Sequence, residues 1–172
     1  VSDLTPGMDT TTAPTRPDYV LGASPASLTL AQLTVREPVG RALDLGTGCG
    51  VQSLHLVGHC QEVVATDVNP RALELAAMTA ELNQVDIDLR AGSLYEPVTG
   101  ERFDLIVSNP PYVMSPPLEQ GERLVYREGS HVADQLVAEV VRGAAAHLNP
   151  GGTAQFLVNW AVLPGEPWEE RL

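Results

Sequence analysis

RALDLGTGCG (residues 41–50) joins an apolar run to a turn that contains three glycines. Residues 41–45 predict a strand buried on both faces, and a helical stretch is expected from about 51 to 57. Gly46, Gly48 and Gly50 allow positive φ and let the backbone approach a ligand without interference from a Cβ. The turn is typical of a nucleotide-type loop. It is not the dinucleotide fingerprint, because Val51 stands where that motif needs glycine or alanine.

A carboxylate at the end of the next apolar run supports this interpretation. Asp67 follows residues 63–66 and lies 19 positions beyond Gly48. A carboxylate at this spacing can accept hydrogen bonds from both hydroxyls of an adenosine ribose. The sequence contains no lysine and no G-K-[ST] motif for holding phosphates. We therefore expect an adenosine ligand that lacks a pyrophosphate.

A second motif is VSNPPY (residues 107–112), which follows the strand-like run 103–107. The side-chain oxygen of Asn109 and the carbonyl of Pro110 are two acceptors that fit the two N–H bonds of a flat amino or amide group. They would favour the positive charge that grows on this nitrogen as it attacks. The prolines fix φ, which keeps the backbone carbonyls pointing toward the substrate nitrogen. Tyr112 would stack on the planar group. The alternative is a rigid turn with Tyr112 as a packing residue.

The two motifs, in this order, resemble those of the class I S-adenosylmethionine-dependent methyltransferases, in the branch that carries N-P-P-Y. That branch includes glutamine methyltransferases of release factors and amino-group methyltransferases of DNA adenine and ribosomal RNA guanine. The resemblance spans roughly residues 24–158. It implies transfer of a methyl group from S-adenosylmethionine to a planar nitrogen.

The resemblance also assigns roles to residues. The cofactor site would comprise Asp44, Gly46, Thr47, Gly48, Gly50, Asp67, Val68, Ser93, Leu94 and Asn109, and the catalytic residues would be Asn109, Pro110 and Tyr112. Asp44 and the glycines would surround the methionine part, and Asp67 would hold the ribose. The family usually carries Gly-Asp after its third strand, where this chain has Gly92-Ser93. Ser93 and the Leu94 backbone would therefore have to meet the adenine amino group.

The remaining pattern predicts an α/β fold, a doubly wound and mostly parallel Rossmann-like sheet of order 3-2-1-4-5. Further helices are expected from Pro25, from Pro70 to Asn83, and over about 132–148. Strands are expected at 87–90 and 153–158, with a helix breaker at 149–152. Class I methyltransferases add two more strands, so we expect that the domain is truncated after strand five. Residues 1–18 are predicted to be a linker or mobile arm, and 19–172 the catalytic domain, as a fragment of a longer protein.

Composition favours a soluble, cytoplasmic enzyme. Of 172 residues, 44% are hydrophobic, which suffices for one core, and no apolar stretch approaches the roughly 18 residues of a membrane span. His55 and His59 lie four apart beside Cys60 and could in principle chelate a metal. No glutamate follows His55 and Gly58 interrupts the helix, so no metal is expected. The sequence does not indicate the oligomeric state.

Charge bears on the methyl acceptor. The net charge is −12, and the ten arginines are scattered rather than gathered into a basic stripe. This favours a protein or small-molecule amide over DNA or RNA. Together with the resemblance carried by N-P-P-Y, it places a protein glutamine first among the acceptors, before RNA or DNA amino groups and then small-molecule amines. Nucleic acid stays possible through a missing domain that carries a basic surface. A cofactor-binding module without activity of its own is the alternative from another class.

Overall fold

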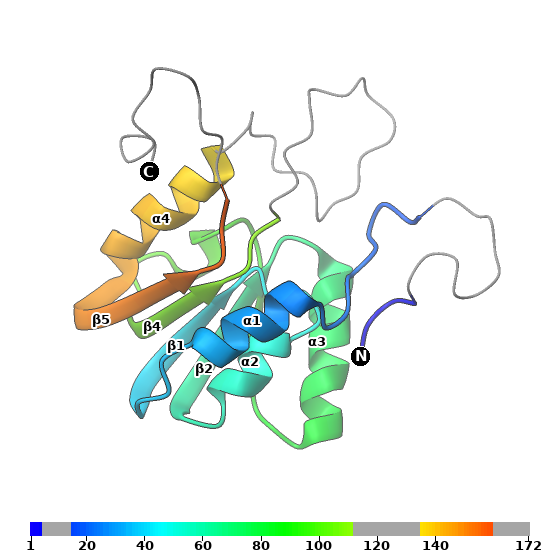
Figure 1. Ribbon diagram of the computed structural model, residues 1–172, viewed down its shortest axis with the longest axis horizontal. Helices are drawn as coiled ribbons and strands as arrows, with labels where there is room; N and C mark the ends of the chain where they lie inside the picture. The colour runs from blue at the N-terminus through cyan, green and yellow to red at the C-terminus, as the bar shows by residue number, and fades with distance from the viewer. Residues whose placement is uncertain (5–14, 112–134, 160–172) are drawn as a thin grey trace.

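The computed structural model describes residues 1–4, 15–111 and 135–159, which form a five-stranded sheet with helices on both faces (Figure 1). All the strand pairs are parallel, and the order is β3-β2-β1-β4-β5. The strands are β1 Val39–Leu45, β2 Cys60–Asp67, β3 Asp88–Ala91, β4 Phe103–Ser108 and β5 Leu148–Phe156. The helices are α1 Pro25–Leu33, α2 Val51–Leu56, α3 Pro70–Asn83 and α4 Gln135–His147, with a 3-10 turn η1 at Glu96–Val98. The predicted doubly wound sheet and its order are confirmed.

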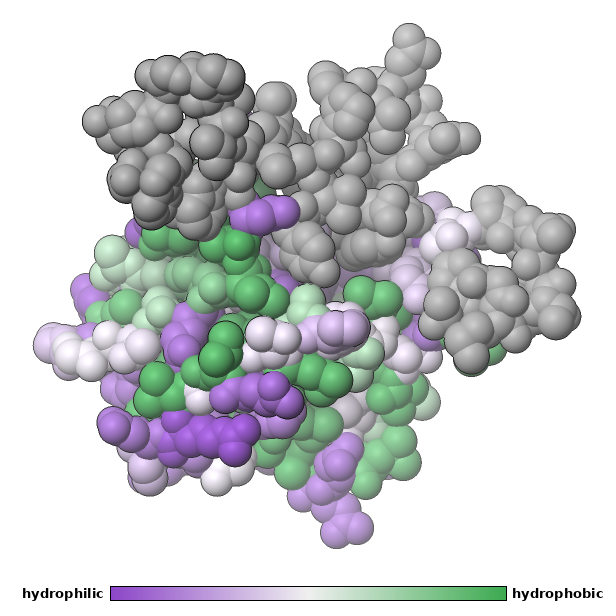
Figure 2. Space-filling model, viewed as in Figure 1, coloured by the Kyte–Doolittle hydropathy of each residue, from purple (hydrophilic) through white to green (hydrophobic). Residues whose placement is uncertain are grey.

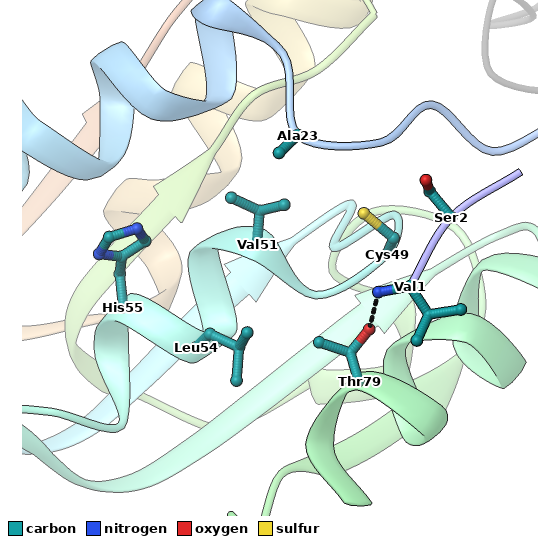
Figure 3. Close-up of a pocket in the computed structure, with 8 residues that line it drawn as sticks. All are labelled: Val1, Ser2, Ala23, Cys49, Val51, Leu54, His55 and Thr79. Carbon is teal, nitrogen blue, oxygen red and sulfur yellow. Dashed lines mark hydrogen bonds between the residues drawn. The ribbon is translucent and has the colours of Figure 1, made fainter. Parts of the chain in front are cut away.

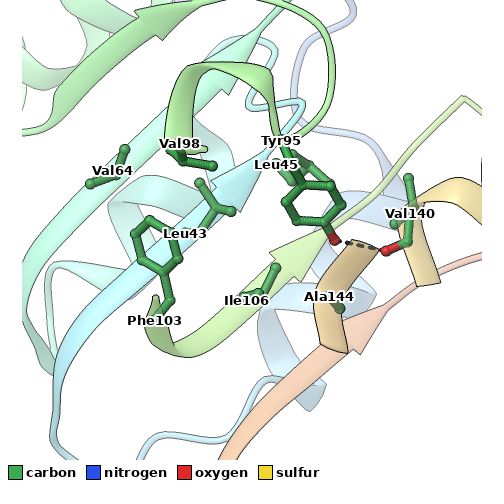
Figure 4. Close-up of a cluster of buried hydrophobic side chains, with 9 residues drawn as sticks. All are labelled: Leu43, Leu45, Val64, Tyr95, Val98, Phe103, Ile106, Val140 and Ala144. Atoms are coloured by element: carbon green, nitrogen blue, oxygen red, sulfur yellow. Dashed lines mark hydrogen bonds between the residues drawn. The ribbon is translucent and has the colours of Figure 1, made fainter. Parts of the chain in front are cut away.

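The core consists of two apolar layers, one on each face of the sheet, because successive side chains of a strand point to opposite faces. On one face, Leu43 and Ile106 pack with Val140 of α4 (Figure 4). On the other face, Ala42 packs with Leu56 of α2. Both layers draw on β1 and β4, so the two central strands are buried on both faces, as their unbroken apolar sequences predict.

Helix starts follow the capping signals in the sequence. Ser24 caps α1 through a reciprocal capping box with Ser27, and the Asn69 side chain accepts a hydrogen bond from Arg71 N at the start of α3. Proline occupies the first position of both helices, where its missing N–H costs nothing. The helix predicted for residues 70–83 is confirmed.

The junction of α4 and β5 differs from the prediction. The helix ends at His147, and β5 pairs with β4 from Leu148 onward instead of beginning at 153. The register then shifts, because Phe103 pairs with Leu148 but Leu105 pairs with Thr153. Residues 149–152 thus bulge out of the strand, with Gly151 at φ 82°. The Asn149 amide donates to Asp104 Oδ1 at 2.8 Å, which fastens this bulge to β4.

β5 is an edge of the sheet in the part of the chain that the structure describes. Its residues are only half-buried or exposed, and Figure 2 shows apolar side chains gathered around β5 and α4. Within the described ranges, no helix is long and apolar enough to cross a membrane.

The first residues of the chain contact α3. Asp3 forms an ion pair with Arg71 and accepts a hydrogen bond from Val20 N at 2.9 Å. The amino group of Val1 donates to Thr79 Oγ1 at 3.0 Å. Residues 5–14, the middle of the predicted arm, lie outside the described residues.

Candidate functional site at the ends of strands one, two and four

The strand registers bring the two sequence motifs to one edge of the sheet. Leu45, the last residue of β1, pairs with Thr66 of β2 and with Ser108 of β4. The glycine turn, Asp67 and Asn109 follow these three residues directly, so they lie side by side at the carboxyl edge of the sheet. Figure 1 shows this edge, where β1, β2 and β4 end. The helices that follow β1 and β4 in the described chain, α2 and α4, pack on opposite faces of the sheet. Such a switch point is where open α/β sheets bind ligands.

The glycine turn presents its backbone to open space. Gly46 and Gly48 have φ of 75° and 55°, and a Cβ added at either would meet no atom of the described residues within 4 Å. The amides of Gly46 and Thr47 donate to the Thr66 carbonyl, both at 2.9 Å, which anchors the turn to β2. Gly50, at φ 85°, differs because its added Cβ would touch Ala76 of α3 at 3.5 Å. The left-handed φ favours glycine at position 50, where a Cβ would point at α3, whereas Gly46 and Gly48 leave room for a ligand.

Asp44 is a buried carboxylate with one occupied and one unoccupied oxygen. Its Oδ2 accepts hydrogen bonds from Thr47 Oγ1 at 2.7 Å, Ser53 Oγ at 2.6 Å and Ser53 N at 2.9 Å. Its Oδ1 is buried without a partner in the described residues. Desolvation by burial raises the pKa of Asp44 to about 6. The free oxygen is therefore suited to a cationic ligand, and the Thr47 hydroxyl serves to orient Asp44.

Asp67 is held in place by backbone amides. Its Oδ2 accepts a hydrogen bond from Gly48 N, and its Oδ1 accepts one from Asn69 N, both at 2.8 Å. Burial raises the pKa of Asp67. Val68 follows it with 58% of its surface exposed, an apolar face next to the carboxylate. The pair offers one polar and one apolar contact at the end of β2.

The turn after β3 lies next to Asp67. Gly92 N donates to the Asp67 carbonyl at 3.1 Å, and Leu94 adopts a left-handed φ of 48°. Ser93 is exposed, and its amide donates to Glu96 Oε2 at 3.3 Å. The structure thus places Ser93 and Leu94 beside the other predicted cofactor residues.

Asn109 provides the second unpaired acceptor of the site. Its Oδ1 is buried and has no hydrogen-bond partner in the described residues. Just before it, Ser108 Oγ donates to the Leu45 carbonyl at 2.6 Å, which fixes the end of β4 to the end of β1. Pro110 is buried, and Tyr112 lies outside the described residues.

Three residues that hold the predicted site residues in place were not identified from the sequence. Ser53 donates twice to Asp44, Thr66 receives two amides of the glycine turn, and Asn69 donates to Asp67. A polar residue at the third position of the helix after the turn was the available signal for Ser53.

A separate hollow of about 350 Å³ lies behind the glycine turn (Figure 3). It is lined by Cys49 of the turn, Leu54 and His55 of α2, Thr79 of α3, and the first two residues. Neither Asp67 nor Asn109 contributes to it, so it is distinct from the edge where the two motifs meet.

Two curated relatives each match about 70% of this chain. A release factor glutamine methyltransferase of Xylella fastidiosa is 40% identical over 72% of this chain and 46% of its own length. A ribosomal RNA small subunit methyltransferase C of Erwinia tasmaniensis is 34% identical over 73% of this chain and 32% of its own. The chain therefore spans less than half the length of these curated relatives.

A solved structure that resembles this chain is also a methyltransferase. The 16S rRNA N2 guanine methyltransferase of T. thermophilus, solved with S-adenosylmethionine and guanosine, superposes with a TM-score of 0.59. It is 28% identical to this chain over 78% of this chain and 34% of its own. Residues 24–167 match the family model of the methyltransferase small domain, and the chain belongs to that family.

Proposed function

We propose that this protein is an S-adenosylmethionine-dependent N-methyltransferase that acts on a planar amide or exocyclic amino nitrogen, foremost a protein glutamine side chain. The observation that carries the proposal is the adjacency of the glycine turn and Asn109 at the ends of two hydrogen-bonded strands. Bound S-adenosylmethionine would supply an electrophilic methyl group on sulfur. The protein would contribute alignment, which can supply on the order of 7–11 kcal/mol to such a reaction.

The described residues fit this cofactor. The unpaired Asp44 Oδ1 suits the ammonium group of its methionine part, and the open space beside Gly46 and Gly48 suits its chain. The Asp67 carboxylate suits the ribose hydroxyls, provided that it exchanges or shares its bond from Gly48 N. The exposed face of Val68 suits one side of the adenine.

Asn109 would hold the acceptor nitrogen. An amide or base nitrogen is a poor nucleophile, because its lone pair is delocalised into the π system. A buried oxygen without a competing donor can accept one N–H bond and stabilise the positive charge that develops on attack. The Pro110 carbonyl would take the second N–H bond.

Two observations favour a protein acceptor. The chain carries a net charge of −12, which repels a polyanion, and one relative is named as a release factor glutamine methyltransferase. The second candidate acceptor is an RNA amino group, because other relatives are named as ribosomal RNA methyltransferases. A basic domain elsewhere in a longer protein would be needed for that function.

The test is a transfer assay with methyl-labelled S-adenosylmethionine on bacterial cell extract, run in parallel on nuclease-treated and protease-treated extract. We expect label that survives nuclease and is released by protease. Label removed by nuclease would instead assign a nucleic acid acceptor. Cofactor binding by calorimetry without any labelled product would assign a cofactor-binding module, and absence of cofactor binding would overturn the proposal.

A further inference from the structure

Tyr95 lies behind the turn of residues 92–94 and fastens that turn to α4. Its side chain is 8% exposed, and its hydroxyl donates to the Val140 carbonyl at 2.7 Å (Figure 4). Its ring stacks on His147 with 4.5 Å between centroids and 15° between planes. Val140 and His147 lie two turns apart on α4, so one side chain contacts the helix at two levels.

The packing of the ring depends on a glycine of α4. A Cβ added at Gly143 would lie 2.3 Å from Tyr95 Cε2, a distance that no real contact allows. The Tyr95 ring therefore occupies the space that a side chain at this position would take. The fit is specific, because it requires glycine on one element and an aromatic ring on the other.

The turn itself is connected to the ends of β2 and β3. Leu94 has a left-handed φ of 48°, an unfavourable conformation for a leucine that the surroundings must hold. Its carbonyl accepts a long hydrogen bond of 3.5 Å from Thr66 Oγ1, and Gly92 N donates to the Asp67 carbonyl. Tyr95 directly follows Leu94 in the chain. The hydrogen bond from the Tyr95 hydroxyl to Val140 of α4 therefore holds the chain in place immediately after the strained Leu94.

We propose that Tyr95 is a positioning residue that sets the base selectivity of the cofactor site, by holding the backbone of Ser93 and Leu94 in place. This inference rests on the proposed function. Under that function the Ser93 side chain and the Leu94 backbone would meet the adenine amino group. The turn that carries them is held by the bonds from Glu96 N to the Ser93 carbonyl at 3.0 Å and from Thr66 Oγ1 to the Leu94 carbonyl. The polar groups of a turn discriminate between an amino and an oxo group only while their positions are fixed.

Calorimetry with two ligands tests this inference in the intact protein. S-adenosylhomocysteine carries the amino group of adenine, and S-inosylhomocysteine carries an oxo group in its place. We expect wild-type protein to prefer the adenosyl ligand, and Tyr95→Phe to reduce that preference by about fivefold, the scale of one lost hydrogen bond. Gly143→Ala, which displaces the same ring from the helix side, is expected to reduce the preference as well.

The control variant is Thr99→Val. It removes a side-chain bond from Thr99 to the Glu96 carbonyl in the following 3-10 turn, without contact to α4, and should leave the preference unchanged. An unchanged preference in folded Tyr95→Phe would overturn the role of Tyr95 and leave the proposed function intact. Absence of binding of both ligands to wild-type protein would overturn the proposed function and this inference together.

Discussion

The Ser108 hydroxyl donates a hydrogen bond of 2.6 Å to the carbonyl of Leu45, its partner across the β1–β4 pair. The glycine turn begins after Leu45, and the N-P-P motif begins after Ser108. This buried bond therefore fixes the two halves of the proposed site against each other.

Ser108→Ala should lower the free energy of unfolding by about 1 kcal/mol and reduce the rate of methyl transfer. The loss of rate follows from the looser alignment of Asn109 with the glycine turn. Urea unfolding and the transfer assay measure the two effects. Thr34→Val is the matched control, because it removes another buried hydroxyl bond, to the Leu30 carbonyl, and neither residue belongs to the two motifs. Equal transfer rates in the two variants would contradict the role given to Ser108.

Gly48→Ala and Gly50→Ala form a second matched pair. Both residues have positive φ, so each alanine should cost about 1–2 kcal/mol of stability. A Cβ at position 48 would enter open space, whereas one at position 50 would touch Ala76. We therefore expect Gly48→Ala to weaken binding of S-adenosylmethionine at least tenfold more than Gly50→Ala does, as measured by calorimetry. Similar affinities would place the cofactor away from Gly48.

Asp44 predicts a pH dependence of stability. Burial raises the pKa of its carboxyl from 3.8 to about 6, so between these values the folded state binds more protons than the unfolded state. The contribution of Asp44 to the free energy of unfolding is thus greatest below about pH 4 and falls as the pH rises to about 6. Asp44→Asn should remove this slope, which urea unfolding across the range detects.

The affinity for S-adenosylmethionine should depend on pH in the opposite direction to stability, and rise as the pH rises. Protonated Asp44 cannot pair with an ammonium group, so affinity for S-adenosylmethionine should fall as the pH drops through about 6. In Asp44→Asn the affinity should be low at all these pH values. A wild-type affinity that is flat across this range would contradict the contact between Asp44 and the cofactor.

Much of the fold was predictable because local signals agree with the tertiary structure. The apolar runs before Gly46 and Asn109 match β1 and β4, and the Asn69-Pro70 pair marks the start of α3. Right-handed crossovers then leave the observed strand order. The convergence of Asp67 with the glycine turn followed from the same topology.

The structure differs from the prediction where contacts between residues distant in sequence determine the local conformation. The bulge after α4 depends on the bond from Asn149 to Asp104, and the sequence pattern indicates only a helix stop there. Gly50 was assigned to the cofactor together with its neighbours, and that assignment stays a prediction. Its left-handed φ of 85° and the direction of an added Cβ, toward Ala76 of α3, are set by tertiary structure that the sequence pattern does not show. The roles of Asn109, Pro110 and Tyr112 stay predictions.

The most direct measurement of the central claim compares Asn109→Ala with Asp67→Ala, using calorimetry with S-adenosylmethionine and the labelled-methyl assay on the same preparations. Because Asn109 would hold the acceptor and Asp67 the ribose, Asn109→Ala should abolish transfer while its cofactor affinity stays close to that of wild type. Asp67→Ala should first weaken cofactor binding. Equal loss of cofactor affinity in both variants would contradict the division of the site into a donor side and an acceptor side.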